Sequence, residues 1–403
     1  MAIRIKAAES AKEIRDVFKL RYQVYVEEEG LFPGVEGDTI VDLFDAVPSV
    51  VNLIAYDEES GKPAGTFRLN LQTDIRLPSD ELFNFDDYRQ RIKAEQERSG
   101  QLLPVFGSGG MLAIAKPWRK RRDVFRGLLK MACAVGVSLG ITHIIATVNE
   151  STAKIYKNLG WEFLGDKIWI ESIRSHILPV ATEVTKMQHW AFRGLVEHQD
   201  LIERFSDRFE WLLSGAQSKV FSEGNQGNEA YLVASGLVKI TQRGESSEEE
   251  LSWTTLSRGC IFGEMSLVDD LPRSASAVAM ANSELIVIGK KHYWEKLESD
   301  AAFMRVALKS LSLRLRDAGQ RATLYAQSDE ETRLTYCLQK LMADAIPLPK
   351  KPEIRISKTT INEFAFMSGV SDGKAEAFLK RQEENNVLTF SEKEMKFLEG
   401  TDL

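Results

Sequence analysis

The chain has 403 residues, 43% hydrophobic and 28% charged, which is typical of a soluble globular protein with two or three domains. Its 52 basic and 59 acidic residues give a net charge of −7, which argues against a surface devoted throughout to nucleic acid. No run of about 18 apolar residues occurs and Met1–Asp16 has no apolar centre, so we expect neither a membrane span nor a secretory signal.

Helical and strand patterns alternate over residues 1–180. Helices are predicted at Glu13–Glu29, Val124–Gly136 and Ser151–Leu159, and strands at Val51–Tyr56, Ala64–Leu71, Met111–Ala115 and Ile141–Val148. This alternation predicts an α/β domain over residues 1–185.

Residues 200–295 have a different sequence pattern, in which short apolar stretches recur between regularly spaced glycines. The predicted strands are Ala230–Val233, Leu237–Thr241, Ala275–Met280 and Leu285–Ile288. Short strands with glycine turns predict a β-barrel or jelly roll.

Residues 300–345 read as one long helix with a heptad seam. The seam residues are Met304, Leu308, Leu311, Leu315, Ala318, Ala322 and Tyr325. We expect a homodimer through this helix near 304–325, with packing against its own domain as the alternative. The barrel and the seam together give a predicted second domain over 198–328, followed by a third over 329–403.

The three cysteines, Cys133, Cys260 and Cys337, are odd in number and far apart. This usage favours reduced thiols and a cytoplasmic protein.

A nucleotide phosphate site is suggested by residues 262–277. Gly263 allows the backbone to approach a ligand closely, and a short helix starting near Glu264 would aim its N–H groups at an anion. Arg273 can make a bidentate pair with phosphate oxygens, and Glu264 can accept from a ribose hydroxyl. The candidate binding residues are Gly263, Glu264, Met265, Ser266, Arg273 and Ser274.

This segment resembles the phosphate-binding cassette of the cyclic-nucleotide-binding family, as found in the catabolite activator group. The resemblance implies cyclic AMP as effector, with cyclic GMP left open. Ala318 and Gly319 stand where that group places a Thr-Ser pair against the base.

In the first half, Leu112-Ala113-Ile114, Pro117, Asn149, Ala153, Tyr156 and Gly160-Trp161 resemble the core of the GNAT acyltransferase superfamily. The resemblance implies an acyl-CoA or acyl carrier protein donor, held by the loop after the strand and by Asn149. In this loop, Arg122 and Val124 replace the two family glycines, so four cations would act by charge: Arg119, Lys120, Arg121 and Arg122. Tyr156 matches the position that in this family often protonates the leaving thiolate, a task suited to a phenol, and the alternative is a helix tyrosine packed in the core.

Arg21-Tyr22, Tyr25, Asp42, Asp45 and Arg68 have a spacing similar to that of the N-acyl-homoserine-lactone synthases and N-acyl amino acid synthases. The resemblance makes Asp42 and Asp45 candidates to receive a proton from the attacking amine, which is a small molecule or a protein lysine. The alternative is that both are helix-capping acids.

Residues 354–388 resemble the winged helix-turn-helix that follows the barrel in the activator group, with helices at Ser357–Phe366 and Asp372–Glu384. Lys374, Lys380 and Arg381 are the candidate DNA contacts. DNA is not the favoured partner, because Asp372, Gly373 and Ala377 stand where base-reading residues are expected.

Two functional hypotheses follow. The favoured one is an N-acyltransferase regulated by a cyclic nucleotide and needing no metal. The alternative is a cyclic-nucleotide-dependent transcription regulator whose first domain senses an acyl compound. The fold class expected for both is α+β multidomain: a GNAT-like domain, a jelly-roll nucleotide domain with a long dimer helix, and a winged helix-turn-helix.

Overall fold

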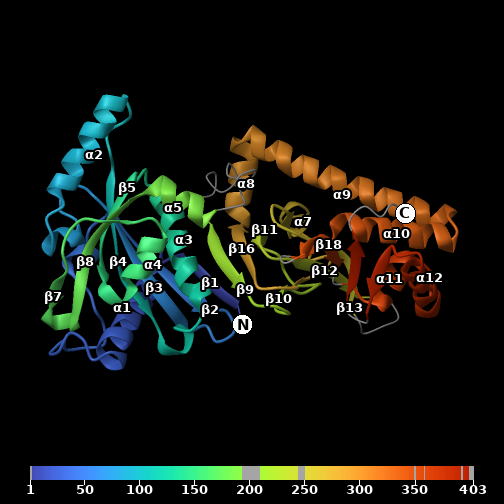
Figure 1. The fold of residues 1–403 in the computed structure, drawn as a ribbon, viewed down its shortest axis with the longest axis horizontal. Helices are drawn as coiled ribbons and strands as arrows, with labels where there is room; N and C mark the ends of the chain where they lie inside the picture. Colours follow the sequence, from blue (N-terminus) through green and yellow to red (C-terminus); the bar gives the residue numbers. More distant parts are fainter. Residues whose placement is uncertain are drawn as a thin grey trace.

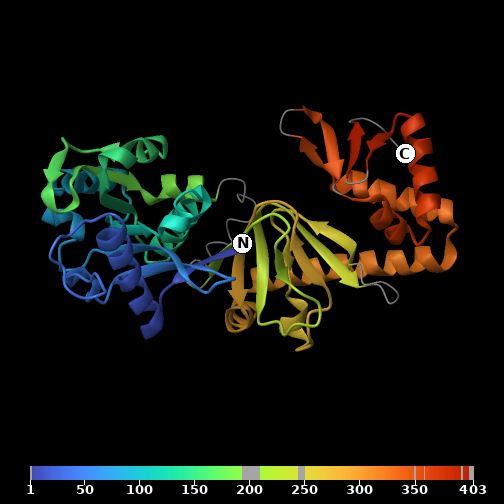
Figure 2. The same ribbon diagram turned by 90° about the horizontal axis from the view of Figure 1, so that it is seen from below.

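The computed structural model describes residues 2–192, 209–243, 250–348, 351–357, 359–391 and 394–398. An α/β part, a β-barrel and a smaller α+β part follow one another along the long axis of the molecule (Figures 1 and 2). The start of the predicted second domain, at residue 198, lies outside the described residues.

The first part is built on a mainly antiparallel sheet. The strands are β1 (Ala2–Ala7), β2 (Val50–Asp57), β3 (Pro63–Leu71), β4 (Phe106–Ile114), β5 (His143–Asn149), β8 (Ser175–Glu183) and β6 (Glu162–Phe163) in spatial order, with β7 (Ile168–Ile170) beside β8. Only the β4–β5 pair is parallel among these. The predicted strands are therefore present, and β4 begins five residues before the predicted Met111.

The helices of this part are α1 (Ala11–Tyr22), which continues as a π-helix over Gln23–Glu28, α2 (Asp86–Ser99), α3 (Arg122–Ser138), α4 (Ala153–Asn158) and α5 (Val184–Ala191). Ser10 and Glu13 form a capping box that starts α1. One face of α3 is buried against the sheet through Val124, Leu128 and neighbouring residues. Short 3₁₀ helices cover Leu43–Asp45, Pro78–Glu81, Lys116–Trp118, Glu150–Thr152 and Glu171–Ile173.

The expected short-strand barrel is confirmed. One of its sheets has the order β10 (Lys219–Phe221), β15 (Ser276–Ala279), β12 (Val238–Arg243) and β13 (Glu250–Leu256). Facing it are β14 (Ile261–Phe262), β11 (Glu229–Ser235), β16 (Ser283–Gly289) and β9 (Glu210–Ser214). The short helix α7 (Met265–Val268) follows β14, and α8 (Lys290–Ser299) follows β16.

The barrel and the first part share one sheet. β9 pairs with β16 on one side and with β1 on the other, so the described strands form a continuous path from β14 to β6. Figures 1 and 2 show β1 lying beside the barrel strands. A single hydrophobic core likewise runs from Leu128 of α3 through Trp211 of β9 to Ile286 of β16.

The long helix predicted over 300–345 is two helices, α9 (Ala301–Gln327) and α10 (Glu330–Asp344). The helix is interrupted at Asp329. The Asp329 carboxylate accepts a hydrogen bond from the Thr332 N–H at 2.8 Å and so caps the second helix. The heptad pattern ends before this break. Four of its large side chains are exposed, Met304, Leu308, Leu315 and Tyr325, as are Ala318 and Ala322.

The last part contains α10, β17 (Ile346–Leu348), β18 (Lys351–Ser357), α11 (Ile361–Ser368), α12 (Asp372–Glu384), β19 (Leu388–Phe390) and β20 (Met395–Leu398). The first of its two predicted helices was placed too early, because Ser357 ends β18 and the capping box of Thr360 and Glu363 starts α11. The second helix has the predicted bounds. In the part of the chain that the structure describes, no helix is long and apolar enough to cross a membrane.

Candidate functional sites

The first site is a cavity of about 390 Å³ between β4 and β5. The two strands pair only from Phe106 and His143 to Gly109 and Ala146, although both continue beyond that point. The cavity is lined by this last pair, Gly109 and Ala146, and by the continuations that no longer pair with each other, Gly110–Leu112 and Thr147–Asn149. The diverging strands therefore open a slot into the centre of the sheet.

The rest of this cavity is largely apolar, as expected for an acyl chain rather than a sugar or nucleotide. Its walls come from β3, α3 and α5 as well as from the diverging strands, and include Phe67, Leu69, Leu112, Leu129, Cys133, Ile144, Trp161 and Met187. Burial raises the pKa of the Cys133 thiol to about 12, so this cysteine is an apolar wall residue and not a nucleophile.

A β-bulge lies at the slot. Arg68 of β3 pairs with Gly110, while Thr66 pairs with Ala113, so Met111 and Leu112 together face Phe67. Met111 adopts a φ of 49°, a strained conformation for a residue with a side chain. The bulge re-aims the β4 backbone at the point where the cavity opens.

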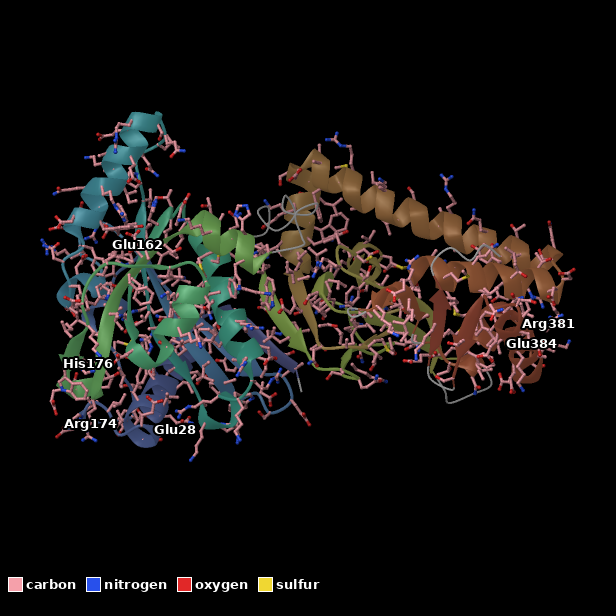
Figure 3. The ribbon with its side chains drawn as sticks, viewed as in Figure 1. Glu28, Glu162, Arg174, His176, Arg381 and Glu384 are labelled. Carbon is pink, nitrogen blue, oxygen red and sulfur yellow. The ribbon has the colours of Figure 1, made fainter. Side chains whose placement is uncertain are left out.

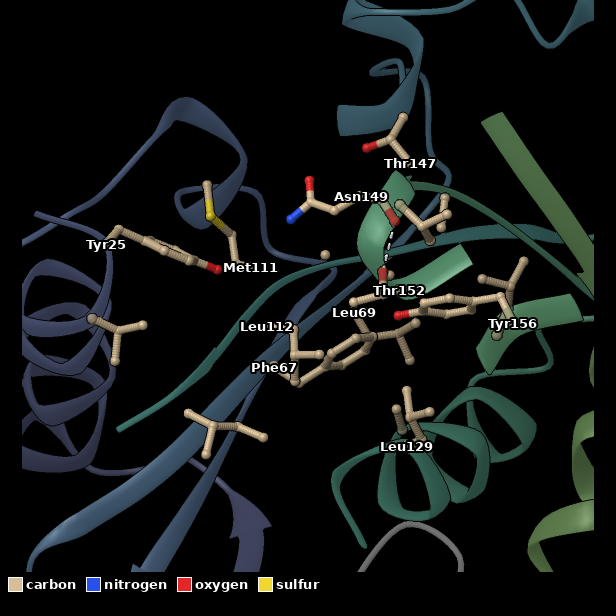
Figure 4. A pocket seen from close by; sticks show the side chains of 18 of the residues that line it. Tyr25, Phe67, Leu69, Met111, Leu112, Leu129, Thr147, Asn149, Thr152 and Tyr156 are labelled. Carbon is tan, nitrogen blue, oxygen red and sulfur yellow. Dashed lines mark hydrogen bonds between the residues drawn. The ribbon is translucent and has the colours of Figure 1, made fainter. Parts of the chain in front are cut away.

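Two phenols face each other across the cavity. Figure 4 shows the Tyr25 hydroxyl directed toward Met111 and the Tyr156 hydroxyl directed inward from α4. Burial raises the pKa of Tyr156 to about 12, and burial also raises the pKa of Tyr25. Both groups are therefore protonated at neutral pH.

The mouth of the cavity carries an ion pair. Arg119 contacts Glu28 at 2.5 Å and Glu29 at 3.2 Å, and both Glu29 and Arg119 line the cavity. Asn149, at the end of β5, also lines it. The structure therefore brings Arg119, Asn149 and Tyr156 of the predicted acyl site together.

The other predicted donor-loop residues lie outside the lining. Lys120 and Arg122 are exposed at the start of α3, and Arg121 pairs with Asp123 at 2.6 Å. Val124 is fully buried in the core, and its N–H donates to the Arg121 carbonyl. Val124 therefore supports the helix start from beneath instead of opening its backbone to a ligand.

Asp42 and Asp45 lie in an ion-pair cluster beside the π-helix and outside the cavity lining. Asp45 contacts Arg21 at 2.9 Å and Arg68 at 3.1 Å, and its side chain is 1% exposed. Burial alone would raise the pKa of Asp45, but the two guanidinium groups hold it below its ordinary value. This setting makes Asp45 a weak base. The carboxylate of Asp42 caps the 3₁₀ helix that begins at Leu43.

A second cavity, of about 300 Å³, lies in the barrel. Gly263, Met265, Ser266, Arg273 and Ser274 line one part of it. The remaining wall comes mainly from β12 and β13, with Phe221 of β10 and Phe262 of β14, and its polar side chains are Gln242 and Thr254. Of the six predicted nucleotide residues, five therefore lie at this cavity.

Arg273 is built into the cavity wall. It donates to Ser266 Oγ at 2.8 Å, to the Glu229 carbonyl at 2.7 Å and to the Gly263 carbonyl, and its guanidinium lies 4.2 Å from the centre of the Phe221 ring. Its Nε is buried and has no hydrogen-bond partner among the described residues. Burial lowers the pKa of Arg273. A buried cation with an unused donor fits an anionic ligand.

Two glycines make room for this arginine. A Cβ at Gly227 would lie 2.0 Å from Ser266 Oγ and 2.9 Å from Arg273 Cζ. Gly263 has a φ of 76°, and a Cβ there would lie 2.8 Å from Arg273 Nη1. Glu264, the sixth predicted residue, is 3% exposed, precedes α7 and does not line the cavity.

The candidate DNA contacts on α12 are all engaged in ion pairs. Lys374 contacts Glu330 at 2.6 Å, Arg381 contacts Glu331 at 2.8 Å, and Lys380 contacts Glu376 on its own helix at 2.8 Å. Figure 3 places Arg381 at the end of the molecule away from the acyl cavity. Acids of α10 therefore offset the charge of this helix.

Sequence reasoning missed several residues at both cavities. Gly227, Gln242 and Thr254 carry no motif, because their positions depend on strand pairing across the barrel. Glu29 lines the acyl cavity and belongs to an acidic run, Glu27–Glu29, that carries no motif. Within the described ranges, no group of three or more His, Cys, Asp and Glu residues could hold a metal ion.

Comparisons with known proteins agree with this division. Residues 16–179 match the family described as N-acyl amino acid synthase FeeM, and residues 215–300 match the cyclic nucleotide-binding domain. The cyclic AMP receptor protein of Thermus thermophilus is 33% identical over 156 residues, which cover 38% of this chain and 70% of that protein.

The cAMP-dependent protein kinase regulatory subunit of Yarrowia lipolytica is 39% identical over 71 residues, which cover 18% of each chain. Among solved structures, a c-di-GMP-responsive global regulator of Xanthomonas campestris is 25% identical with a TM-score of 0.42, covering 50% of this chain and 99% of that one. The chain thus spans most of the Thermus protein but less than a fifth of the kinase subunit.

Proposed function

We propose that this chain, which belongs to the cyclic AMP receptor protein family and joins to it an N-acyl amino acid synthase FeeM domain, transfers an acyl group to an amine under the control of a cyclic nucleotide. The observation that carries the proposal is that one continuous sheet holds the first cavity between β4 and β5 and borders the second through Phe262 of its edge strand β14. The first has an acid suited to acyl transfer, and the second has a buried cation suited to a phosphate.

In the proposed reaction the acyl chain occupies the apolar cavity and its thioester carbonyl lies at the β4 bulge. The amine nitrogen attacks the carbonyl carbon, the carbon–sulfur bond breaks, and the departing sulfur takes the phenolic proton of Tyr156. The raised pKa of Tyr156 keeps the phenol protonated before the reaction. The proton lost by the amine passes through water at the mouth of the cavity to the Tyr156 phenolate, which restores the phenol.

The proposed donor is acyl-CoA or an acyl carrier protein, which share a phosphate-bearing pantetheine arm. Arg119, Lys120, Arg121 and Arg122 would attract the phosphate, and Asn149 would orient the arm. We propose that Asp42 and Asp45 have a structural role, since they lie in the cluster with Arg21 and Arg68.

The proposed acceptor is a small amine that also carries a carboxylate. Glu29 and Arg119 form an acid–base pair at the cavity mouth, which is complementary to an ammonium and a carboxylate on one small molecule. A protein lysine would offer only the ammonium.

The proposed effector is cyclic AMP, as in the name of the Thermus relative, with cyclic GMP as the competing ligand. Arg273, Ser266 and Ser274 would hold the phosphate, while Gln242 and Thr254 supply polar groups to the base. We retain Glu264 as the acceptor for the ribose hydroxyl, because its backbone lies between two residues of the cavity wall.

We further propose that α9 forms a homodimer interface and that residues 329–403 have a winged helix-turn-helix arrangement. A DNA-binding regulator has less support as the main function, since Lys374, Lys380 and Arg381 are all ion-paired.

Free thiol release from acyl-CoA and acyl carrier protein donors tests the proposal, with amino acids and simple alkyl amines as acceptors. We expect an amide product by mass spectrometry and a rate that changes with cyclic nucleotide. Nucleotide binding without thiol release from any donor would overturn the enzyme and favour the regulator.

A further inference from the structure

The junction between the two cavities has an arginine at its centre. Arg4 of β1 contacts Glu58 of the acyl part at 2.8 Å, and it contacts Glu210 and Glu229 of the barrel at 2.6 and 2.8 Å. Its side chain is 18% exposed, so these contacts are screened less than those of a surface pair. One guanidinium therefore ties together carboxylates from both parts.

Glu229 connects this junction to the nucleotide cavity. Its backbone carbonyl accepts from Arg273 Nη2 at 2.7 Å, while its carboxylate accepts from Arg4 and, at 2.8 Å, from the Tyr231 hydroxyl. A phosphate bound by Arg273 would compete for the same guanidinium N–H groups. Occupation of the cavity would therefore act on the contact between Arg273 and Glu229.

Helix α3 connects the junction to the acyl cavity. Lys130 of α3 contacts Glu284 of the barrel at 2.6 Å, and its ammonium lies 5.4 Å from the centre of the Trp211 ring. A Cβ at Gly127 would lie 2.5 Å from Ile5 Cδ1, so α3 also presses closely on β1. The same helix begins at the donor loop and lines the acyl cavity through Leu129.

We propose that Arg4 is a positioning residue that transmits nucleotide occupancy at Arg273 to the acyl cavity, through Glu229 on the barrel side and Glu58 and α3 on the acyl side. The inference rests on the proposed function and identifies the contact through which the effector acts. Arg4 lines neither cavity, so its removal is expected to uncouple the two cavities while leaving each one able to bind.

The test uses the full chain with three variants. Arg4→Met removes the central charge, Arg4→Lys keeps a charge without the planar fork, and Glu58→Gln removes only the acyl-side contact. The matched control is Arg91→Met, which breaks an exposed pair with Glu162 on the acyl part, away from the barrel. Cyclic AMP binding is measured by calorimetry, and the acyl-transfer rate is measured with and without cyclic AMP.

Hydrogen exchange supplies a readout that does not depend on activity. In the wild type, cyclic AMP is expected to change amide protection both in the barrel and over residues 119–127. In Arg4→Met and Glu58→Gln, the change in amide protection is expected to be confined to the barrel. The acyl-transfer rate with cyclic AMP divided by the rate without it is expected to move toward one by about fivefold or more. Arg4→Lys should restore part of the ratio, and Arg91→Met should keep it.

The outcomes separate the inference from the proposed function. Wild-type-like ratios and exchange in Arg4→Met and Glu58→Gln would overturn the role of Arg4 and leave a regulated acyltransferase standing. A wild type that binds cyclic AMP and transfers acyl groups at an unchanged rate, with no exchange response beyond the barrel, would overturn both. Should Arg4→Met fail to fold, Glu58→Gln decides the question, because it leaves the barrel contacts of Arg4 intact.

Discussion

Arg273 lies at the point where the nucleotide cavity meets the interior of the barrel. Its guanidinium is held by Ser266 and by the carbonyls of Gly263 and Glu229, and its Nε remains available within the described structure. The rigid placement means that little side-chain entropy is lost when an anion binds.

We predict that Arg273→Ala weakens cyclic AMP binding by about tenfold to a hundredfold, since charge-assisted hydrogen bonds contribute about 1.5–3 kcal/mol each. Isothermal titration calorimetry measures the effect. Arg258→Ala is the control, because Arg258 is an exposed arginine of the same barrel that does not line the cavity. Equal affinity in Arg273→Ala and the wild type would remove Arg273 from the site.

Tyr156 is the corresponding residue of the acyl cavity. We predict that Tyr156→Phe lowers kcat for acyl transfer by about 10²- to 10⁴-fold, because the leaving sulfur loses its proton donor. Cyclic AMP affinity should stay unchanged. Tyr88→Phe, a buried tyrosine outside the cavity, should retain the wild-type kcat. A Tyr156→Phe variant with the wild-type kcat would rule out the phenol as the acid.

Asp45 has a structural task in our account. Its replacement would leave Arg21 as a buried charge without its carboxylate, while Arg68 would keep Asp42, so Asp45→Asn is predicted to destabilise the fold by about 3–5 kcal/mol. Denaturant unfolding monitors this change. Asp38→Asn, which breaks an exposed pair with Lys19, should have no measurable effect.

The lowered pKa of Asp45 also fixes a pH dependence. Its contribution to stability is fully present above the unfolded pKa near 3.8 and is lost as the pH falls through the lower folded value. Unfolding of the wild type should therefore become easier below about pH 4. An Asp45→Asn curve with the same acid limb would contradict this assignment.

At the scale of elements, α9 presents an apolar seam to solvent. Leu308 and Leu315 are 55% and 76% exposed, and such a row of large apolar side chains indicates an interface. We predict a dimer in sedimentation velocity and a monomer for Leu315→Glu. Lys309→Glu, an exposed change off the seam, should leave the dimer intact. A monomeric wild type would contradict the heptad interpretation.

Local patterns predicted many elements well. α3 begins two residues before the predicted Val124, and α12 has the predicted bounds. Both agree with the prediction because helical periodicity and capping depend on residues that are close together in the sequence. The single helix predicted over 300–345 was wrong, since helical patterns lie on both sides of a short break at Ser328 and Asp329, and Asp329 caps the second helix.

Features that depend on distant pairing were not predictable. β1 pairs with β9 over a separation of about 200 residues, and no local signal marks it as a link between two parts. The cassette around Arg273 was recognisable because its ligand groups lie within 16 residues. By contrast, Gln242 and Thr254 reach the same cavity only after the barrel has formed.

At the scale of the whole molecule, the continuous sheet makes regulation across the two parts a physical expectation. The shared core from α3 to β16 means that a change in barrel packing must be accommodated by strands that also border the acyl part. A flexible tether between independent domains would not impose this requirement.

The most direct test of the account is the acyl-transfer rate as a function of cyclic AMP concentration, compared with the calorimetric Kd of the same preparation. If the barrel cavity controls the reaction, the midpoint of the rate change equals that Kd, and Arg273→Ala shifts both to higher concentration together. A rate that is flat across the Kd, or a response that persists unchanged in Arg273→Ala, would contradict a nucleotide-gated acyltransferase.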